Sequence, residues 1–135
     1  MMGHALWYTS RATGLVSLVL LTVVVVLGAA NVARFATGGW PRFVISAVHR
    51  NLSLLALTFI AVHVATSIID PYAGIGWLDA VIPFQSVYKP FWLGLGAAAG
   101  DLLVAIIVTS LLRLRIGLRW WRLVHWAAYA CWPLA

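Results

Sequence analysis

The sequence predicts an all-α fold, a multi-pass bundle of transmembrane helices. Of the 135 residues, 64% are hydrophobic and only 9% are charged, whereas about a quarter of the residues of a soluble domain are charged. The apolar residues form long runs, which is typical of membrane spans. The cationic residues gather where these runs end. Together these observations leave too little polar surface to enclose a water-soluble core.

Four apolar segments are predicted to span the bilayer. The first is interpreted as a retained span, because it is long for a signal peptide and no small-residue cleavage site follows it before Arg34. The second ends at Asp70, because Pro71 cannot continue the helix. The third ends before Arg113. The segments cover about residues 14–32, 44–69, 91–112 and 122–135.

The fourth segment is still apolar at Ala135. Its roughly 14 residues, at about 1.5 Å each, reach ~21 Å, which is less than the ~30 Å of a hydrocarbon core. A carboxylate inside the bilayer is costly. The sequence therefore predicts a truncated chain, with four spans visible.

The cationic residues predict the orientation of these spans. The N-terminal side carries Arg11 and Lys89, and seven arginines fall on the opposite side. Because cytoplasmic loops carry the excess of Lys and Arg, we expect a plasma-membrane protein, in contact with lipid, whose N-terminus lies outside. The seven residues are Arg34, Arg42, Arg50, Arg113, Arg115, Arg119 and Arg122.

Composition argues against two classes of function. The net charge of +6 comes from arginines at span ends that form no basic stripe, so nucleic-acid binding is not expected. Cys131 is the single cysteine of the chain, which excludes an intrachain disulfide and dithiol redox chemistry.

Two histidines share the second segment. His49 and His63 are 14 residues apart, so at about 100° per residue they return to within about 40° of the same face, with a rise of about 21 Å. Their imidazoles are therefore predicted to point the same way from opposite leaflets. Ionisable residues inside spans are rare and usually functional.

A third histidine completes a predicted site for b-type haem. The second and fourth segments enter the bilayer from the same side, and His49 and His125 lie near their starts. A porphyrin between them would receive one axial imidazole from each. The partner of His63 would lie about 13 residues past His125, beyond the end of the chain. We therefore expect one complete haem b site and one half site.

Two other interpretations of the histidines stay open. They could bond neighbouring carbonyls as packing residues, or bind another metal such as zinc or copper. No cysteine or carboxylate clusters with them, and ligands about 21 Å apart on one helix cannot hold one ion. His4 lies in the tail and is expected to be inert.

Three charged residues are candidates for contacts around the haem. Asp101 has about the depth of His63 and could accept its Nδ1 proton, which would strengthen the ligand. Equally, Asp101 could bond hydroxyls or backbone. Arg11 and Arg50, near the outer and inner boundaries, could pair with haem propionates or simply extend to the interface.

Several motifs run along the chain: Ala5-Leu6-Trp7-Tyr8, Arg11-Ala12-Thr13-Gly14, His49-Arg50-Asn51-Leu52-Ser53, Ala61-Val62-His63, Asp70-Pro71-Tyr72-Ala73, Pro90-Phe91-Trp92-Leu93-Gly94, Thr109-Ser110-Leu111-Leu112-Arg113 and Val124-His125-Trp126. They resemble the ferric-reductase-like transmembrane domain family, the b-type cytochrome membrane domain of ferric reductases and NADPH oxidases. The resemblance implies a six-helix bundle with two stacked b haems, each held by two histidines. It gives three of the four expected ligands, His49, His63 and His125.

The predicted function is a membrane b-type cytochrome that relays electrons across the bilayer. No flavin or nicotinamide domain is present, so a separate flavoprotein or quinone would supply the electrons, and whether the chain is itself an enzyme stays open. One alternative is a non-catalytic membrane anchor or assembly subunit. Another is a quinone-binding subunit without haem, in which Asp101 and His63 would handle protons.

Overall fold

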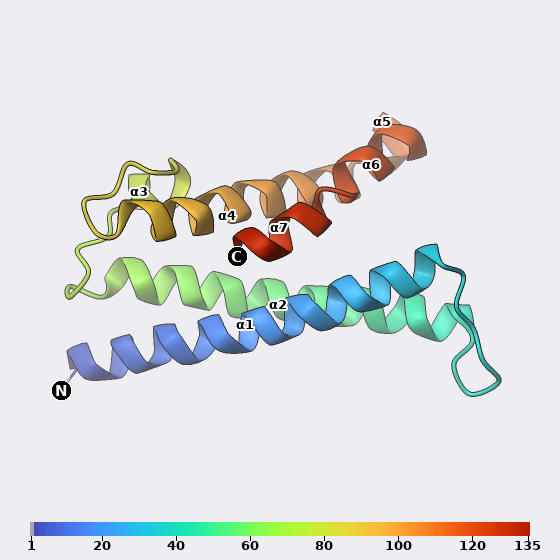
Figure 1. The fold of residues 1–135 in the computed structure, drawn as a ribbon, viewed down its shortest axis with the longest axis horizontal. Helices are drawn as coiled ribbons and strands as arrows, with labels where there is room; N and C mark the ends of the chain where they lie inside the picture. Colours follow the sequence, from blue (N-terminus) through green and yellow to red (C-terminus); the bar gives the residue numbers. More distant parts are fainter. Residues whose placement is uncertain (1) are drawn as a thin grey trace. The chain divides into compact units, whose positions relative to one another are not determined.

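The computed structural model describes residues 2–135, and this range contains helices and loops but no strand (Figure 1). The helices fall into two compact units, α1 and α2 in the first and α3 to α7 in the second. Their bounds are α1 Met2–Val32, α2 Arg42–Ile69, α3 Trp77–Val81, α4 Pro90–Leu111, α5 Arg113–Ile116, α6 Leu118–His125 and α7 Ala128–Leu134.

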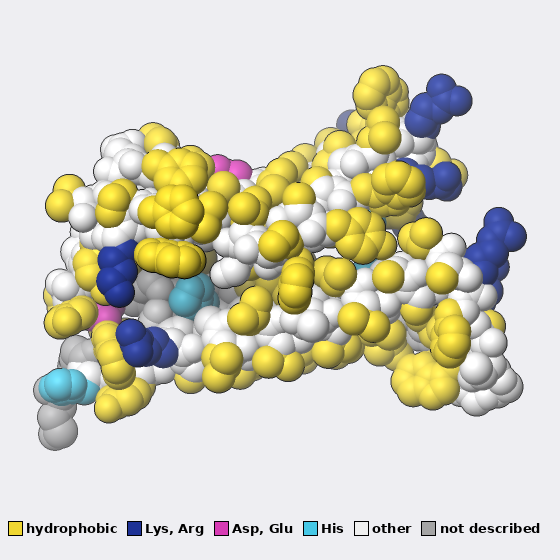
Figure 2. All heavy atoms as spheres, in the orientation of Figure 1, with side chains coloured by type: hydrophobic (Ala, Val, Ile, Leu, Met, Phe, Trp, Pro, Cys, Tyr) yellow, Lys and Arg dark blue, Asp and Glu magenta, His cyan; other side chains and the backbone are white. Residues whose placement is uncertain are grey.

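Within the described residues, three helices are long and apolar enough to cross a membrane: His4–Val32, Arg42–Ile69 and Pro90–Leu111. They cover the first three predicted spans and establish a multi-pass helical membrane protein. Figure 2 shows apolar side chains over most of the visible surface of the long helices, with Lys and Arg side chains near the ends. A fourth span and a total of six helices stay predictions.

The predicted fourth span is divided into α6 and α7. After His125 the backbone tightens, because the amides of Ala127, Tyr129 and Ala130 each bond the carbonyl three residues earlier. Such i→i−3 bonds belong to a 3₁₀ turn, which changes the direction of a helix. The apolar run is therefore helical on both sides of a bend that hydropathy does not reveal.

The first unit is an antiparallel hairpin of two long helices. Arg34 adopts a left-handed φ of 54°, and the amide of Phe35 bonds the carbonyl of Ala30 at 2.9 Å. This hydrogen bond closes the helix end as in a Schellman motif. The chain then turns and enters α2 after Pro41, so that α2 runs back along α1.

Small and polar residues form the contact between α1 and α2. Ser17 on α1 and Ala56 on α2 are buried, with 5% and 1% of their surfaces exposed. Toward the loop that joins the helices, the Ser46 hydroxyl donates to Asn31 Oδ1 at 3.0 Å. Small residues at such contacts allow helix backbones to approach closely in a membrane, where packing and hydrogen bonds stabilise the pair.

The second unit is organised around α4. Cys131 on α7 is buried and its thiol donates to the carbonyl of Ala99 at 3.3 Å. Trp121 on α6 donates its indole Nε1–H to the Ser110 hydroxyl at 3.1 Å. Both contacts use small residues of α4, so the two short C-terminal helices pack against one long helix.

Candidate functional site

His63 is bonded to the backbone of the neighbouring helix. Its Nδ1 lies 2.7 Å from the carbonyl oxygen of Ser10 on α1. The ring also lies against Gly14, where an added Cβ would come within 2.9 Å of the imidazole Nδ1 and Cε1. We call His63, Ser10 and Gly14 the His63 site.

His49 makes the same kind of contact near the other end of the hairpin. Its Nδ1 lies 3.1 Å from the carbonyl oxygen of Val24. A Cβ added at Gly28 would lie 3.4 Å from the imidazole Cε1. We call His49, Val24 and Gly28 the His49 site. Both histidines face α1. Their 14-residue spacing predicts that they share a face of α2, but it does not predict which helix that face meets.

The same arrangement of residues occurs twice along the two helices. Ser10 and Val24, whose carbonyl oxygens accept these hydrogen bonds, are 14 residues apart, and so are the glycines Gly14 and Gly28. In each site the glycine follows its carbonyl residue by four positions. Side chains of a helix lean toward its N-terminus and cover the preceding turn. A glycine at this position therefore leaves the carbonyl open to a donor from α2.

These contacts define which ring nitrogen carries the proton. A carbonyl oxygen only accepts hydrogen bonds, so each imidazole must donate from Nδ1–H. In a neutral imidazole the other nitrogen, Nε2, then holds the lone pair. Hydrogen bonding of one ring nitrogen to a carbonyl is the usual way in which proteins orient a metal-ligating histidine. The geometry thus leaves the lone pair of each imidazole on Nε2, and the two Nε2 atoms lie about 21 Å apart along α2.

His125 lies at the last position of α6, immediately before the bend. Its ring stacks on Trp121, with the centroids 4.9 Å apart and the planes 28° from parallel. The stacking orients the imidazole from within its own helix. Its predicted pairing with His49 stays a prediction.

The charged candidates have exposed side chains. Arg11 places its guanidinium 4.2 Å from the centre of the Trp7 ring, a cation–π contact. Arg50 and Asp101 are exposed on α2 and α4. The acceptor found for His63 Nδ1 is the Ser10 carbonyl and not the predicted Asp101 carboxylate, because the neighbouring helix brings a main-chain oxygen within 2.7 Å of the ring. The propionate contacts predicted for Arg11 and Arg50 stay predictions.

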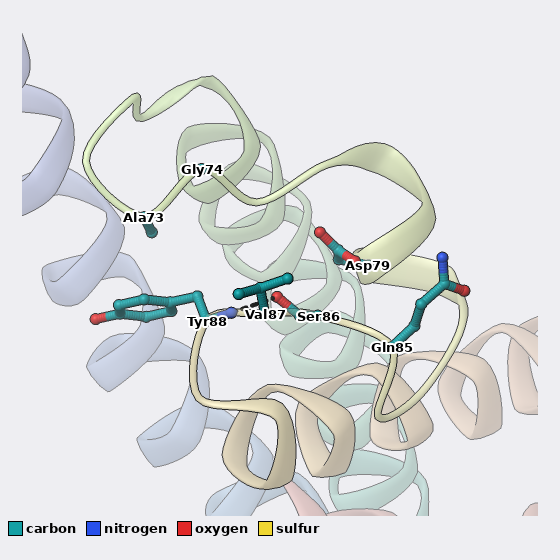
Figure 3. A pocket seen from close by; sticks show the side chains of 7 residues that line it. All are labelled: Ala73, Gly74, Asp79, Gln85, Ser86, Val87 and Tyr88. Carbon is teal, nitrogen blue, oxygen red and sulfur yellow. Dashed lines mark hydrogen bonds between the residues drawn. The ribbon is translucent and has the colours of Figure 1, made fainter.

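A surface pocket of about 480 Å³ lies in the loop between α2 and α4 (Figure 3). Its polar groups serve the loop itself: the Asp79 carboxylate accepts the amide of Gly76 at 2.9 Å, and the Ser86 hydroxyl accepts the amide of Tyr88 at 3.2 Å. It contains none of the predicted site residues. The lining residues are Ala73, Gly74, Asp79, Gln85, Ser86, Val87 and Tyr88.

No group of three or more His, Cys, Asp or Glu side chains that could hold a metal ion occurs among the described residues. The chain is thus a multi-pass helical membrane protein in which two α2 imidazoles are oriented by the neighbouring helix α1. Residues 13–135 match the family described as ferric reductase like transmembrane component. The chain belongs to that family, which indicates a membrane electron-transfer component. No curated protein and no solved structure matches it.

The α1 half of both sites is not predicted from the sequence. Ser10, Gly14, Val24 and Gly28 carry no metal-binding chemistry in their side chains, so a search for ligands passes over them. A signal was present, because the two glycines repeat the 14-residue spacing of the histidines. The register between α1 and α2 is needed to recognise it.

Proposed function

We propose that this protein is a b-type cytochrome of the plasma membrane that relays electrons across the bilayer. His49, His63 and His125 are the proposed axial ligands. The observation that carries the proposal is that both α2 imidazoles are bonded through Nδ1 to α1 carbonyls, which directs the Nε2 lone pair to a metal. Family membership supports the same function.

The donor set fits haem better than a bare ion. A protein site for zinc or copper needs several side chains around one ion, and the described residues contain no such group. Porphyrin supplies four nitrogen ligands itself, so the protein needs to supply only axial imidazoles. Haem, when bound, supplies the one-electron couple of its iron.

The residues of the hairpin have separate tasks in this proposal. The Nε2 of each imidazole would hold the haem iron, and the α1 carbonyl accepts the Nδ1 proton and fixes the ring plane. The apolar helices keep water away, which favours fast electron transfer between fixed groups over side reactions. Arg11 and Arg50 are proposed to pair with propionates, and Asp101 is proposed to bond hydroxyls or backbone at about the depth of His63.

The two sites lie at different depths of one hairpin. His63 bonds to Ser10 near the start of α1, and His49 bonds to Val24 farther along it. With the N-terminus outside, as the arginine distribution predicts, His63 serves the outer haem and His49 the inner one. His125 is the proposed second ligand of the inner haem. A separate flavoprotein or quinone is the proposed electron donor.

A haem count on the purified protein tests the proposal. The pyridine haemochrome assay, expressed per chain, is expected to show b-type haem. His49→Ala and His125→Ala should each remove the same haem, because they share it, and His63→Ala should remove the other. His4→Ala is the matched control, since His4 is exposed in the first turns of α1.

The result also separates the alternatives. A colourless wild-type protein would support an anchor or a haem-free quinone-binding subunit. An unchanged reduced haem spectrum in His49→Ala would contradict the ligand assignment while leaving haem binding intact.

A further inference from the structure

The Ser10 hydroxyl differs from most other hydroxyls of α1 and α2 in its hydrogen-bond partner. Most Ser and Thr side chains of α1 and α2 donate to the carbonyl four residues earlier in their own helix, which is the usual bond of a helical hydroxyl. Ser10 instead reaches the other helix, with its Oγ 2.6 Å from Ser67 Oγ. The residues with bonds inside their own helix include Thr9, Thr13, Ser17, Thr22, Ser53, Thr58, Thr66 and Ser67.

The direction of the Ser10–Ser67 hydrogen bond follows from its neighbours. Ser67 donates its single hydroxyl proton to the carbonyl of His63 at 2.7 Å. It can therefore only accept from Ser10. Ser10 thus donates through its hydroxyl and accepts, through its carbonyl, the Nδ1 proton of His63.

These hydrogen bonds form a closed ring around one ligand. The His63 side chain donates to the Ser10 carbonyl, the Ser10 hydroxyl donates to Ser67, and Ser67 donates to the His63 carbonyl. The two hydrogen bonds that share the Ser67 hydroxyl polarise each other. The ring fixes the Ser10 backbone against α2 at the height of the imidazole.

The His49 site has the same parts except one. Ser53 donates to the His49 carbonyl at 2.7 Å, as Ser67 does for His63. The α1 residue that corresponds to Ser10 is Val24, which has no hydroxyl. No ring can close there, and the distance from Nδ1 to the carbonyl oxygen is 3.1 Å in place of 2.7 Å.

We infer that the Ser10–Ser67 bridge is a positioning device that shortens the His63 hydrogen bond and lowers the reduction potential of the haem bound there. The inference rests on the proposed function. A stronger bond from Nδ1–H moves charge onto the imidazole, which makes it a better donor to iron. A better donor stabilises the ferric over the ferrous state. Haem bound at this site would accept one electron from the proposed flavoprotein or quinone donor, and no bond within the bridge would break.

A reciprocal exchange of the two α1 residues tests the inference. Ser10→Val removes the bridge at the His63 site, and Val24→Ser offers the missing hydroxyl to Ser53 at the His49 site. In a redox titration of the haem-loaded protein, Ser10→Val should raise the potential of one haem and Val24→Ser should lower that of the other. The expected size is about a two- to tenfold change in the ferrous-to-ferric ratio at fixed ambient potential, the effect of one hydrogen bond.

Further variants assign the effect to the bridge. Ser67→Ala should move the same haem as Ser10→Val and in the same direction. Thr58→Ala is the control, because its hydroxyl bonds only within α2, to Leu54, and the residue is exposed. In haem-free protein with ¹⁵N-labelled histidine, the His63 Nδ1–H resonance should move upfield in Ser10→Val, as expected for a weaker hydrogen bond.

The outcomes separate the two proposals. A wild-type protein without haem would overturn the proposed function and this inference together. Haem-loaded protein in which Ser10→Val and Ser67→Ala leave both potentials unchanged would overturn the inference alone. If Ser10→Val does not fold, Val24→Ser decides, and an unchanged inner potential in that variant overturns the inference.

Discussion

The His63 ring lies closer to α1 than the His49 ring does. The distance from Nδ1 to the α1 carbonyl oxygen is 2.7 Å at the His63 site and 3.1 Å at the His49 site. A Cβ added at the glycine of each site would lie 2.9 Å from the His63 ring and 3.4 Å from the His49 ring. Both sites use the same backbone plan, a carbonyl followed four residues later by glycine. The sites differ in how closely the ring approaches α1. Helix register therefore places the imidazoles, whereas single side chains adjust how closely each imidazole is held against α1.

The largest expected effect comes from a buried residue on α2 between the two sites. Ala56 lies midway between His49 and His63 and is 1% exposed. Ala56→Leu should push α1 away from α2 and cost about 1–3 kcal/mol in stability. We expect haem to be lost from both sites and the thermal midpoint in detergent to fall. Ala61→Leu is the control, because Ala61 is exposed on α2. Retention of both haems in Ala56→Leu would show that the close approach is not required.

Gly14→Ala should affect only the His63 site. The new Cβ would lie 2.9 Å from the imidazole, closer than side chains tolerate, so the ring or the helix must move. We expect most of the outer haem to be lost, while the inner haem stays. Haem per chain and the reduced absorption spectrum measure this. Equal loss of both haems would mean that the two sites are not independent.

Gly28→Ala is the milder counterpart. Its Cβ would meet the His49 ring at 3.4 Å, a contact that a small shift can relieve. The inner haem should stay bound, with a change in its midpoint potential or its electron paramagnetic resonance signal. If Gly28→Ala removed more haem than Gly14→Ala, the difference in closeness between the sites would have no functional meaning.

The smallest effect is expected at a polar contact outside both sites. Ser46→Ala removes the hydrogen bond to Asn31, and such contacts between transmembrane helices contribute about 0.6 kcal/mol on average. Thermal unfolding in detergent should shift slightly, without a change in haem content. A loss of inner haem in this variant would extend the His49 site to the loop end of the hairpin.

Much of this fold follows from the sequence. Hydropathy predicts the first three long helices, and the 14-residue spacing of His49 and His63 predicts that they face the same way. The bend after His125 is not predicted, because it arises from local i→i−3 bonds inside an unbroken apolar run. The acceptors for the imidazoles were also missed. Every residue has a main-chain carbonyl, so residue type does not identify the acceptor. Only the register between α1 and α2 shows that the carbonyls of Ser10 and Val24 accept these hydrogen bonds.

The choice of main-chain oxygens as partners of the imidazoles has a further consequence. A carboxylate in that position could take up a proton whenever the iron gained an electron, whereas an amide oxygen does not titrate in the physiological range. The hairpin therefore gives the two imidazoles a neutral hydrogen-bond acceptor at two depths. If an electron moved between haems at these two depths, the carbonyl groups would take up no proton to balance its charge. Each transfer would therefore move a net charge through the membrane potential.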